Sequence, residues 1–143
     1  MKRKFKFRIW HHGFKRFLST EEWLIGFGGK IFFIEIHGAG ISLIECKENF
    51  TIQQFTGEYD SYGSGIYEGD VLLYSFKPDE HGDREQHSGE VYFEAGQFLI
   101  DKSFEFSFPE IKLENREVVG NIFVDRRKKK HRISRNENIR RRK

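Results

Sequence analysis

The chain has 143 residues, a formal net charge of +3, two prolines and one cysteine. This length is enough for one medium-sized domain or two small ones, each folding without disulfides or a structural metal. Phenylalanine occurs 16 times, whereas alanine, the best helix former, occurs only at Ala39 and Ala95. The composition therefore favours a mainly β protein whose core is filled by aromatic side chains.

The single Cys46 excludes an internal disulfide and suits a reducing compartment, and its apolar neighbours predict a small buried side chain. The longest apolar runs, such as residues 31–34, fall far short of the roughly 20 residues that span a membrane as a helix. Lys6 and Arg8 lie where the apolar region of a signal peptide would begin. We therefore expect a cytoplasmic protein that has no membrane anchor.

The charge is distributed unevenly along the chain. Residues 126–143 carry 11 Lys/Arg and one acid, a net charge of +10, whereas residues 1–125 have a net charge of −7. Seven of the remaining bases lie within residues 2–16. A polyanion would therefore be attracted to the two ends of the sequence and repelled by its middle.

The first part of the chain predicts a hairpin and a short helix. Residues 4–10 alternate between apolar and basic side chains, which is typical of a half-buried strand. A turn at His12-Gly13 would let residues 14–18 pair back on this strand. Ser19 followed three residues later by Glu22 is a capping-box pattern, and it predicts a helix over residues 20–25 that ends at the following glycines.

Two further strands, residues 31–37 and 41–46, are separated by Gly38-Ala39-Gly40 and predict a second hairpin. Residues 49–55 form another extended stretch, and residues 58–65 read as a polar, glycine-rich loop.

The second half of the chain predicts a series of short strands with tight turns. We expect a turn at residues 68–70, a charged and mobile loop at 77–88, and strands at residues 66–67, 71–76, 90–94, 97–101, 104–108 and 118–124. Short strands at this spacing are typical of a small barrel or sandwich, and residues 66–124 have the size of a five-stranded barrel.

No group of residues in the sequence dictates a reaction. A glycine between Glu68 and Asp70 predicts a turn in which Asp70 caps backbone amides, rather than an acid pair or a metal site. His81, Asp83 and His87 are ligand-type residues, but they lie in one predicted loop without a rigid scaffold. His11 and His12 are neighbours on a strand and would point to opposite faces. We expect no metal, no cofactor and no catalytic residue.

Residues 26–30 are glycine-rich but lack the Gly-Lys-Ser/Thr ending and the following helix of a phosphate loop, so they read as a connector. The strongest electrostatic signal is the basic tail, residues 126–143. It has only two aliphatic side chains, which predicts disorder in the unbound state. Its candidate contacts to DNA or RNA phosphates are Arg126, Arg127, Lys128, Lys129, Lys130, Arg132, Arg135, Arg140, Arg141, Arg142 and Lys143.

Three sequence blocks resemble the YopX family. The first is Lys6-Phe7-Arg8-Ile9-Trp10, in which Ile9 replaces a small residue of the family pattern. The second is Gln54-Phe55-Thr56-Gly57 followed by Ile66-Tyr67-Glu68-Gly69-Asp70, with Phe55 in place of tyrosine. The third is Val118-Val119-Gly120-Asn121-Ile122-Phe123. The residues that carry the resemblance are Trp10, Thr56, Gly57, Tyr67, Glu68, Gly69, Asp70, Gly120 and Asn121.

The resemblance implies a mainly β (α+β) fold in a phage or prophage protein of a bacterial host. It implies a β-rich segment at residues 1–55 and an SH3-like five-stranded barrel at residues 56–125, with the basic tail beyond it. It implies no catalytic residues.

Three functions follow from these observations. The first is a non-enzymatic accessory or regulatory module that contacts a host or phage protein or self-assembles, and that binds DNA or RNA non-specifically through its tail. The second is a purely protein-interaction or oligomeric structural module, motivated by Tyr59, Tyr62 and the strand edges. The third is a small metal-dependent hydrolase or nuclease.

Overall fold

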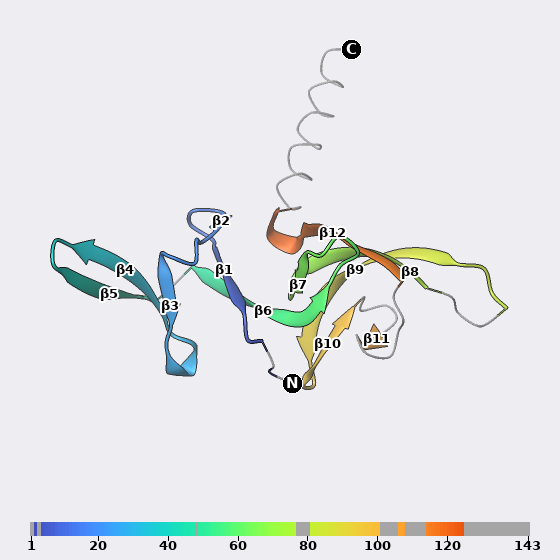
Figure 1. Ribbon diagram of the computed structural model, residues 1–143, viewed down its shortest axis with the longest axis horizontal. Helices are drawn as coiled ribbons and strands as arrows, with labels where there is room; N and C mark the ends of the chain where they lie inside the picture. The colour runs from blue at the N-terminus through green and yellow to red at the C-terminus, as the bar shows by residue number, and fades with distance from the viewer. Residues whose placement is uncertain are drawn as a thin grey trace, which may run out of the picture. The chain divides into compact units, whose positions relative to one another are not determined.

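The computed structural model is mainly β, and it describes residues 2, 4–47, 49–76, 81–100, 106–107 and 114–124. Figure 1 shows the strands and the short 3-10 helix η1. In chain order they are β1 (Phe7–His11), β2 (Arg16–Phe17), β3 (Trp23–Ile25), η1 (Phe27–Gly29), β4 (Ile31–His37), β5 (Gly40–Cys46), β6 (Phe50–Tyr59), β7 (Gly65–Tyr67), β8 (Asp70–Phe76), β9 (Glu85–Glu94), β10 (Gln97–Ile100), β11 (Phe106–Ser107) and β12 (Glu114–Asn121). All strand pairs are antiparallel.

The chain divides into two compact units. One consists of residues 6–54, and the other of residues 1–5 and 55–143. The boundary lies inside β6, whose first half pairs with β1 and whose second half pairs with β7.

In the unit of residues 6–54, β2, β1 and the first half of β6 are neighbours, and β3, β4 and β5 form a separate three-stranded sheet. The predicted hairpins of residues 4–18 and 31–46 are confirmed by the pairing of β1 with β2 and of β4 with β5. Their core consists of Ile9, Leu18 and Ile31, against which Trp23, Ile25, Phe33, Cys46, Phe50 and Ile52 pack. Cys46 is half-buried at this core.

The predicted helix over residues 20–25 is wrong. One of the two capping-box contacts forms, since the Ser19 amide donates to Oε2 of Glu22 at 2.7 Å. The Glu22 amide donates to the Ser19 carbonyl at 3.0 Å and not to the Ser19 hydroxyl. These hydrogen bonds close a single turn, after which β3 pairs with β4 in the register Trp23↔Phe33 to Ile25↔Ile31. Pairing with a distant strand has overridden the local helix signal because it buries Trp23 and Ile25 in the core.

The half-buried pattern predicted for residues 4–10 is also wrong in part. Ile9 lies on the predicted inner face, but Trp10 on the opposite face is buried as well, and Phe5 is exposed. The Trp10 ring meets Phe17 of β2 edge-on, with ring centroids 5.0 Å apart. The strand is therefore covered on both faces toward its end.

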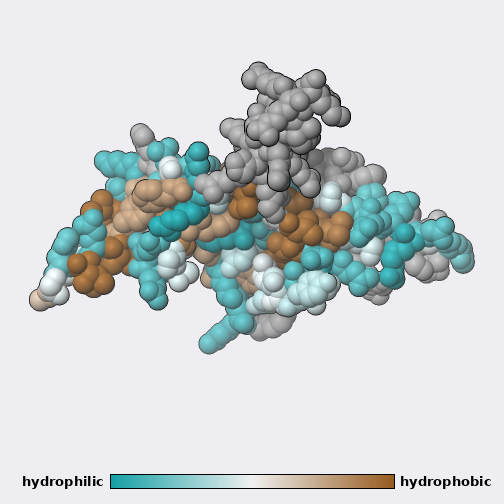
Figure 2. Space-filling view, turned by 90° about the horizontal axis from the view of Figure 1, so that it is seen from above, coloured by the Kyte–Doolittle hydropathy of each residue, from teal (hydrophilic) through white to brown (hydrophobic). Residues whose placement is uncertain are grey.

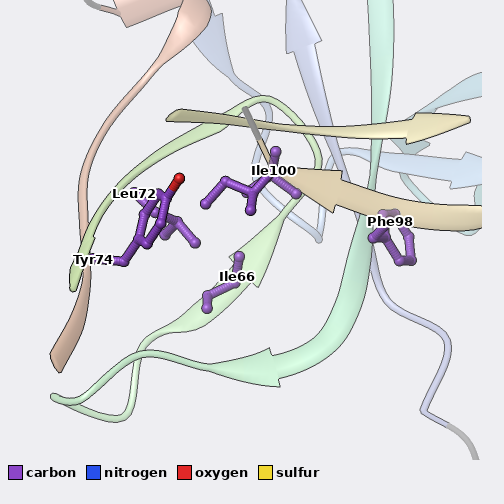
Figure 3. Packing of buried hydrophobic residues seen from close by; sticks show 6 residues of the cluster. Ile66, Leu72, Tyr74, Phe98 and Ile100 are labelled. Atoms are coloured by element: carbon purple, nitrogen blue, oxygen red, sulfur yellow. The ribbon is translucent and has the colours of Figure 1, made fainter. Parts of the chain in front are cut away.

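The other unit contains a five-stranded sheet with the order β11-β10-β9-β8-β12. Its core is formed by Ile66, Leu72, Tyr74, Val91, Phe98 and Ile100, with Val118 packed against it. Figure 3 shows Ile66, Leu72, Tyr74 and Ile100 grouped together, and Phe98, which lies on β10 with Ile100, farther from the group. The strands predicted at residues 66–67, 71–76, 90–94 and 97–101 thus supply the buried residues of this core.

Two predictions for this unit need correction. The charged loop predicted at residues 77–88 ends earlier, because Glu85 to Ser88 belong to β9 and pair with Phe76 to Leu73 of β8. The strand predicted at residues 118–124 ends at Asn121, and residues 122–124 are helical. Only residues 106–107 of the strand predicted at 104–108 are described, and they form β11.

Candidate functional site

The residues of the second and third sequence blocks meet at the junction between β8 and β12. Asp70 begins β8 and Asn121 ends β12, and the two are paired in the sheet register. Both side chains are buried. Nδ2 of Asn121 donates to Oδ1 of Asp70 at 3.2 Å, and the Tyr67 amide donates to Oδ2 of Asp70 at 2.9 Å. The prediction that Asp70 caps backbone amides in a turn is confirmed.

Gly69 completes this junction through its backbone. Its φ angle is 80°, in the left-handed region that favours glycine. Its amide donates to the Val91 carbonyl at 2.7 Å, and its carbonyl accepts from the Ile122 amide at 2.9 Å. One turn therefore connects β8, β9 and the end of β12, with Glu68 half-buried beside it.

Asn121 has a second role at the same place. Its Oδ1 accepts a hydrogen bond from the Phe123 amide at 3.1 Å, the bond that an N-cap side chain makes to the first turn of a helix. This cap explains why the strand ends at Asn121 and residues 122–124 are helical. Gly120 precedes it in β12 and pairs with Val71.

Thr56 and Gly57 lie in the second half of β6. Oγ1 of Thr56 donates to the Ile66 carbonyl at 2.9 Å and accepts from the Glu58 amide at 3.1 Å. Gly57 has φ 93°, and the register between β6 and β7 shifts between Phe55 and Tyr59. Thr56 and Gly57 therefore lie where the regular pairing of β6 with β7 is interrupted, and their hydrogen bonds and backbone conformation fix the path of the strand there.

Sequence reasoning missed a second polar junction, in the loop between β6 and β7. Asp60 is buried and accepts hydrogen bonds from the amides of Tyr62 (2.9 Å), Ser64 (2.8 Å) and Val118 (3.2 Å). Burial acts to raise the pKa of Asp60, but these backbone hydrogen bonds and the charge of Arg116 outweigh it and lower the pKa below its ordinary value. The loop is thus bound to β12.

Arg116 of β12 reinforces this junction. Its Nε donates to the Tyr59 carbonyl at 2.7 Å, its Nη2 lies 2.8 Å from Oε2 of Glu58, and its carbonyl accepts from the Ser61 amide. Tyr62, at the tip of the loop, is 77% exposed. Asp60 precedes a turn that contains serine and glycine, and this local pattern predicts hydrogen bonds within the loop. Its partner Arg116 in β12 lies 56 residues later, so no local pattern indicates that contact.

The candidate ligand-type residues lie apart from these junctions. His81 and Asp83 are exposed, and Nε2 of His87 lies 3.0 Å from Oε2 of Glu85 within β9. His11 stacks on Phe14 at 4.1 Å, whereas His12 bonds Oγ1 of Thr51 at 2.8 Å. Across the described ranges, no three His, Cys, Asp or Glu side chains are grouped as metal ligands would be. Residues 26–30 form the connector that contains η1.

Sequence reasoning also missed an apolar surface on the sheet of β3, β4 and β5. The register pairs Ile36 with Ile41 and Ile34 with Leu43, which places these four side chains on one face. Ile36 is 78% exposed, Ile41 70% and Leu43 53%. Figure 2 shows hydrophobic side chains at the surface in the region of β4 and β5, which Figure 1 labels. We call Leu24, Ile34, Ile36, Ile41 and Leu43 the apolar face.

The candidate nucleic-acid contacts of residues 126–143 lie outside the described residues. None of the described helical segments is long and apolar enough to span a membrane.

The fold and its two polar junctions define a two-unit antiparallel β protein in which a buried Asp–Asn pair and a glycine turn connect the strands of the second unit. The family model described as YopX protein matches residues 6–126, and the chain belongs to the YopX family. No curated protein matches the sequence significantly.

A solved structure with a similar fold is the crystal structure of protein EF1440 from Enterococcus faecalis. It is 23% identical in sequence, the match covers 84% of this chain and 94% of that chain, and the TM-score is 0.54. At this identity the likeness concerns the fold alone.

Proposed function

We propose that this YopX-family protein is a non-enzymatic accessory or regulatory module of a phage or prophage, which acts in the cytoplasm of the bacterial host by contacting other proteins. The observation that carries the proposal is the apolar face, because contiguous exposed apolar patches of about a few hundred Å² in soluble proteins are often interaction surfaces. The buried polar groups of the second unit, Asp60, Asp70 and Asn121, bond to its own backbone and side chains, so they serve the fold.

We further propose that the five-stranded sheet of the second unit belongs to an SH3-like barrel, and that residues 126–143 form a disordered basic extension. In support, the antiparallel order β11-β10-β9-β8-β12 has the strand number of such a barrel. The net charge of +10 with few apolar residues supports disorder of the extension.

The protein-contact function is tested by capture of partners from host cells. Full-length protein and an Ile36→Glu, Ile41→Glu variant would be used as bait after nuclease treatment. Ser42→Glu, an exposed change on the other face of β5, is the matched control. Partners retained by the parent and the control but lost by the double variant support the proposal. Equal capture by the parent, the double variant and the control would show that the apolar face does not bind the captured partners.

The auxiliary function of the tail is DNA or RNA binding without base preference. If about six tail cations contact phosphates, the logarithm of the binding constant falls with the logarithm of salt concentration with a slope of about −4 to −5. A full-length variant with Lys128, Lys129 and Lys130 changed to Gln should bind more weakly and with a shallower slope. Equal affinity of the variant and the parent would leave the second candidate, a protein-interaction module without nucleic-acid binding, which the apolar face alone supports.

A further inference from the structure

The outer part of the β4–β5 hairpin has one polar and one apolar face. On one side lie Glu35, His37 and Ser42, all exposed, and Glu35 and His37 bond to each other at 3.1 Å. On the other side lie Ile34, Ile36, Ile41 and Leu43 of the apolar face. An antiparallel sheet with this alternation has its apolar side packed against a core and its polar side in water.

The core of this unit lies on the opposite side of the same sheet. Ile31, Phe33 and Cys46 share the face of Glu35 and His37, and they pack with Ile9 and Leu18. The core therefore ends before Glu35, and the apolar face is not part of it. The hairpin continues beyond the core with its hydrophobic residues on the other side, which indicates a separate partner for that side.

From this, and resting on the proposed function, we infer that the partner is a second copy of this chain, whose apolar face packs on the first across a twofold axis. Within residues 6–54 there are six Lys/Arg and five acids, so two copies of this unit do not repel each other by net charge. The register also places Glu45 on the same side of the sheet as Ile34 and Leu43, and Glu45 already pairs with Lys30 at 3.5 Å, so its charge does not require a charged partner on the other copy. Apolar side chains of this kind complement themselves, as a twofold contact requires.

The size of the face sets the strength of the contact. Leu24, Ile36, Ile41 and Leu43 are 44–78% exposed, which corresponds to apolar surface on the order of a few hundred Å² per chain. Two such faces bury less than the roughly 1,600 Å² of a standard stable interface. The dimer is therefore concentration-dependent, with the two sheets stacked about 10 Å apart.

Sedimentation velocity of the full-length protein over a wide concentration series tests this inference. We expect a monomer–dimer equilibrium whose dissociation constant rises at least about tenfold in Ile36→Glu and Ile41→Glu. Ser42→Glu is the matched control and should leave the equilibrium unchanged. Ile36→Ser, a milder change at a 78% exposed position, gives a second variant, and circular dichroism of each verifies the fold. A strict monomer, or a dimer insensitive to all three apolar-face changes, overturns the inference.

Cross-linking separates face-to-face packing from pairing at the outer edge of β5. Under mild oxidation, Ile36→Cys should join two chains, whereas Ser42→Cys should not exceed the background given by Cys46 in the parent. Cross-linking through Ser42→Cys alone means edge pairing and overturns the stacked arrangement. A chain that stays monomeric but still captures a host protein through Ile36 and Ile41 overturns the dimer and leaves the proposed function standing.

Discussion

Nδ2 of Asn121 donates a hydrogen bond of 3.2 Å to Oδ1 of Asp70, which joins the last residue of β12 to the first residue of β8. These residues are 51 positions apart, and both are buried. Oδ2 of Asp70 also accepts a hydrogen bond from the Tyr67 amide, and Oδ1 of Asn121 accepts one from the Phe123 amide. Two of the sequence blocks that identify the family thus form one network, and their role is to fix the ends of two neighbouring strands.

Removal of either partner leaves buried polar groups unsatisfied. We expect Asn121→Ala and Asp70→Ala each to lower the free energy of unfolding by about 2–4 kcal/mol, since each loses two hydrogen bonds in a buried site. Urea unfolding of the two single variants and the double variant measures this. The double variant should lose less than the sum of the single losses, with a coupling of about 1–2 kcal/mol. Simple additivity would show that the pair does not act as a unit.

Gly57 offers a test of backbone strain without steric change. A Cβ built at this position meets no atom within 4 Å, yet its φ is 93°. Gly57→Ala should therefore cost about 1 kcal/mol from conformation alone, and Gly57→Asn less, because asparagine tolerates positive φ better than alanine. Thermal unfolding of both variants measures the difference. Gly40→Ala is the control, since it lacks positive φ and its nearest contact is an ordinary 3.7 Å. An equal loss in Gly40→Ala would contradict the argument.

The loop held by Asp60 should loosen in acid. The pKa of Asp60 is lowered in the folded protein, so the stability that the ionised carboxylate contributes is fully present above its unfolded value of about 3.9. It is lost as the pH falls below that value through the folded pKa. Amide hydrogen exchange at Tyr62, Ser64 and Val118, measured from neutral pH down to about pH 3, should show protection falling in this window. In Asp60→Asn the amides should be less protected at neutral pH, and the acid-dependent step should disappear.

Arg116 and Arg16 provide a matched pair of arginines. Nε of Arg116 bonds the Tyr59 carbonyl while its Nη2 bonds Glu58, and its side chain is 22% exposed. Arg16 pairs with Glu22 at 3.1 Å, with both side chains well exposed. We expect Arg116→Lys to destabilise the protein by about 1 kcal/mol, because lysine cannot make both bonds in this fork geometry. Arg16→Lys should change stability much less. Chemical unfolding of the two variants compares them, and a larger effect at Arg16 would contradict this ranking.

Patterns within a few residues predicted much of this fold. The alternation of residues 31–37 and 41–46, with glycines between them, was enough to predict the β4–β5 hairpin. The residue types of Glu68-Gly69-Asp70 were enough to predict the turn. Ser19 and Glu22 show where such reasoning fails. The Ser19 amide bonds to the Glu22 carboxylate as in a capping box, but the following residues form β3 because pairing with β4 is more favourable than a helix.

The remaining errors also come from distant partners. The polar residues Glu85 to Ser88 resemble a loop in sequence, but they pair with β8 as part of β9. Asn121 carries a local signal, since asparagine is a good N-cap, but the apolar residues that follow resemble a strand more strongly. The contacts of Asp60 with Val118 and Arg116 depend on which strands become neighbours, and no short pattern encodes this.

The unit boundary between Gln54 and Phe55 lies within the ten residues of β6 and not in a linker. Side chains alternate along a strand, so one inserted or deleted residue at this point would reverse which side chains of the following half point inward. Phe55, now 4% exposed, would exchange its place with a neighbour of different size and polarity. An insertion or deletion at this point would therefore keep the inward-facing side chains in place only if it comprised an even number of residues.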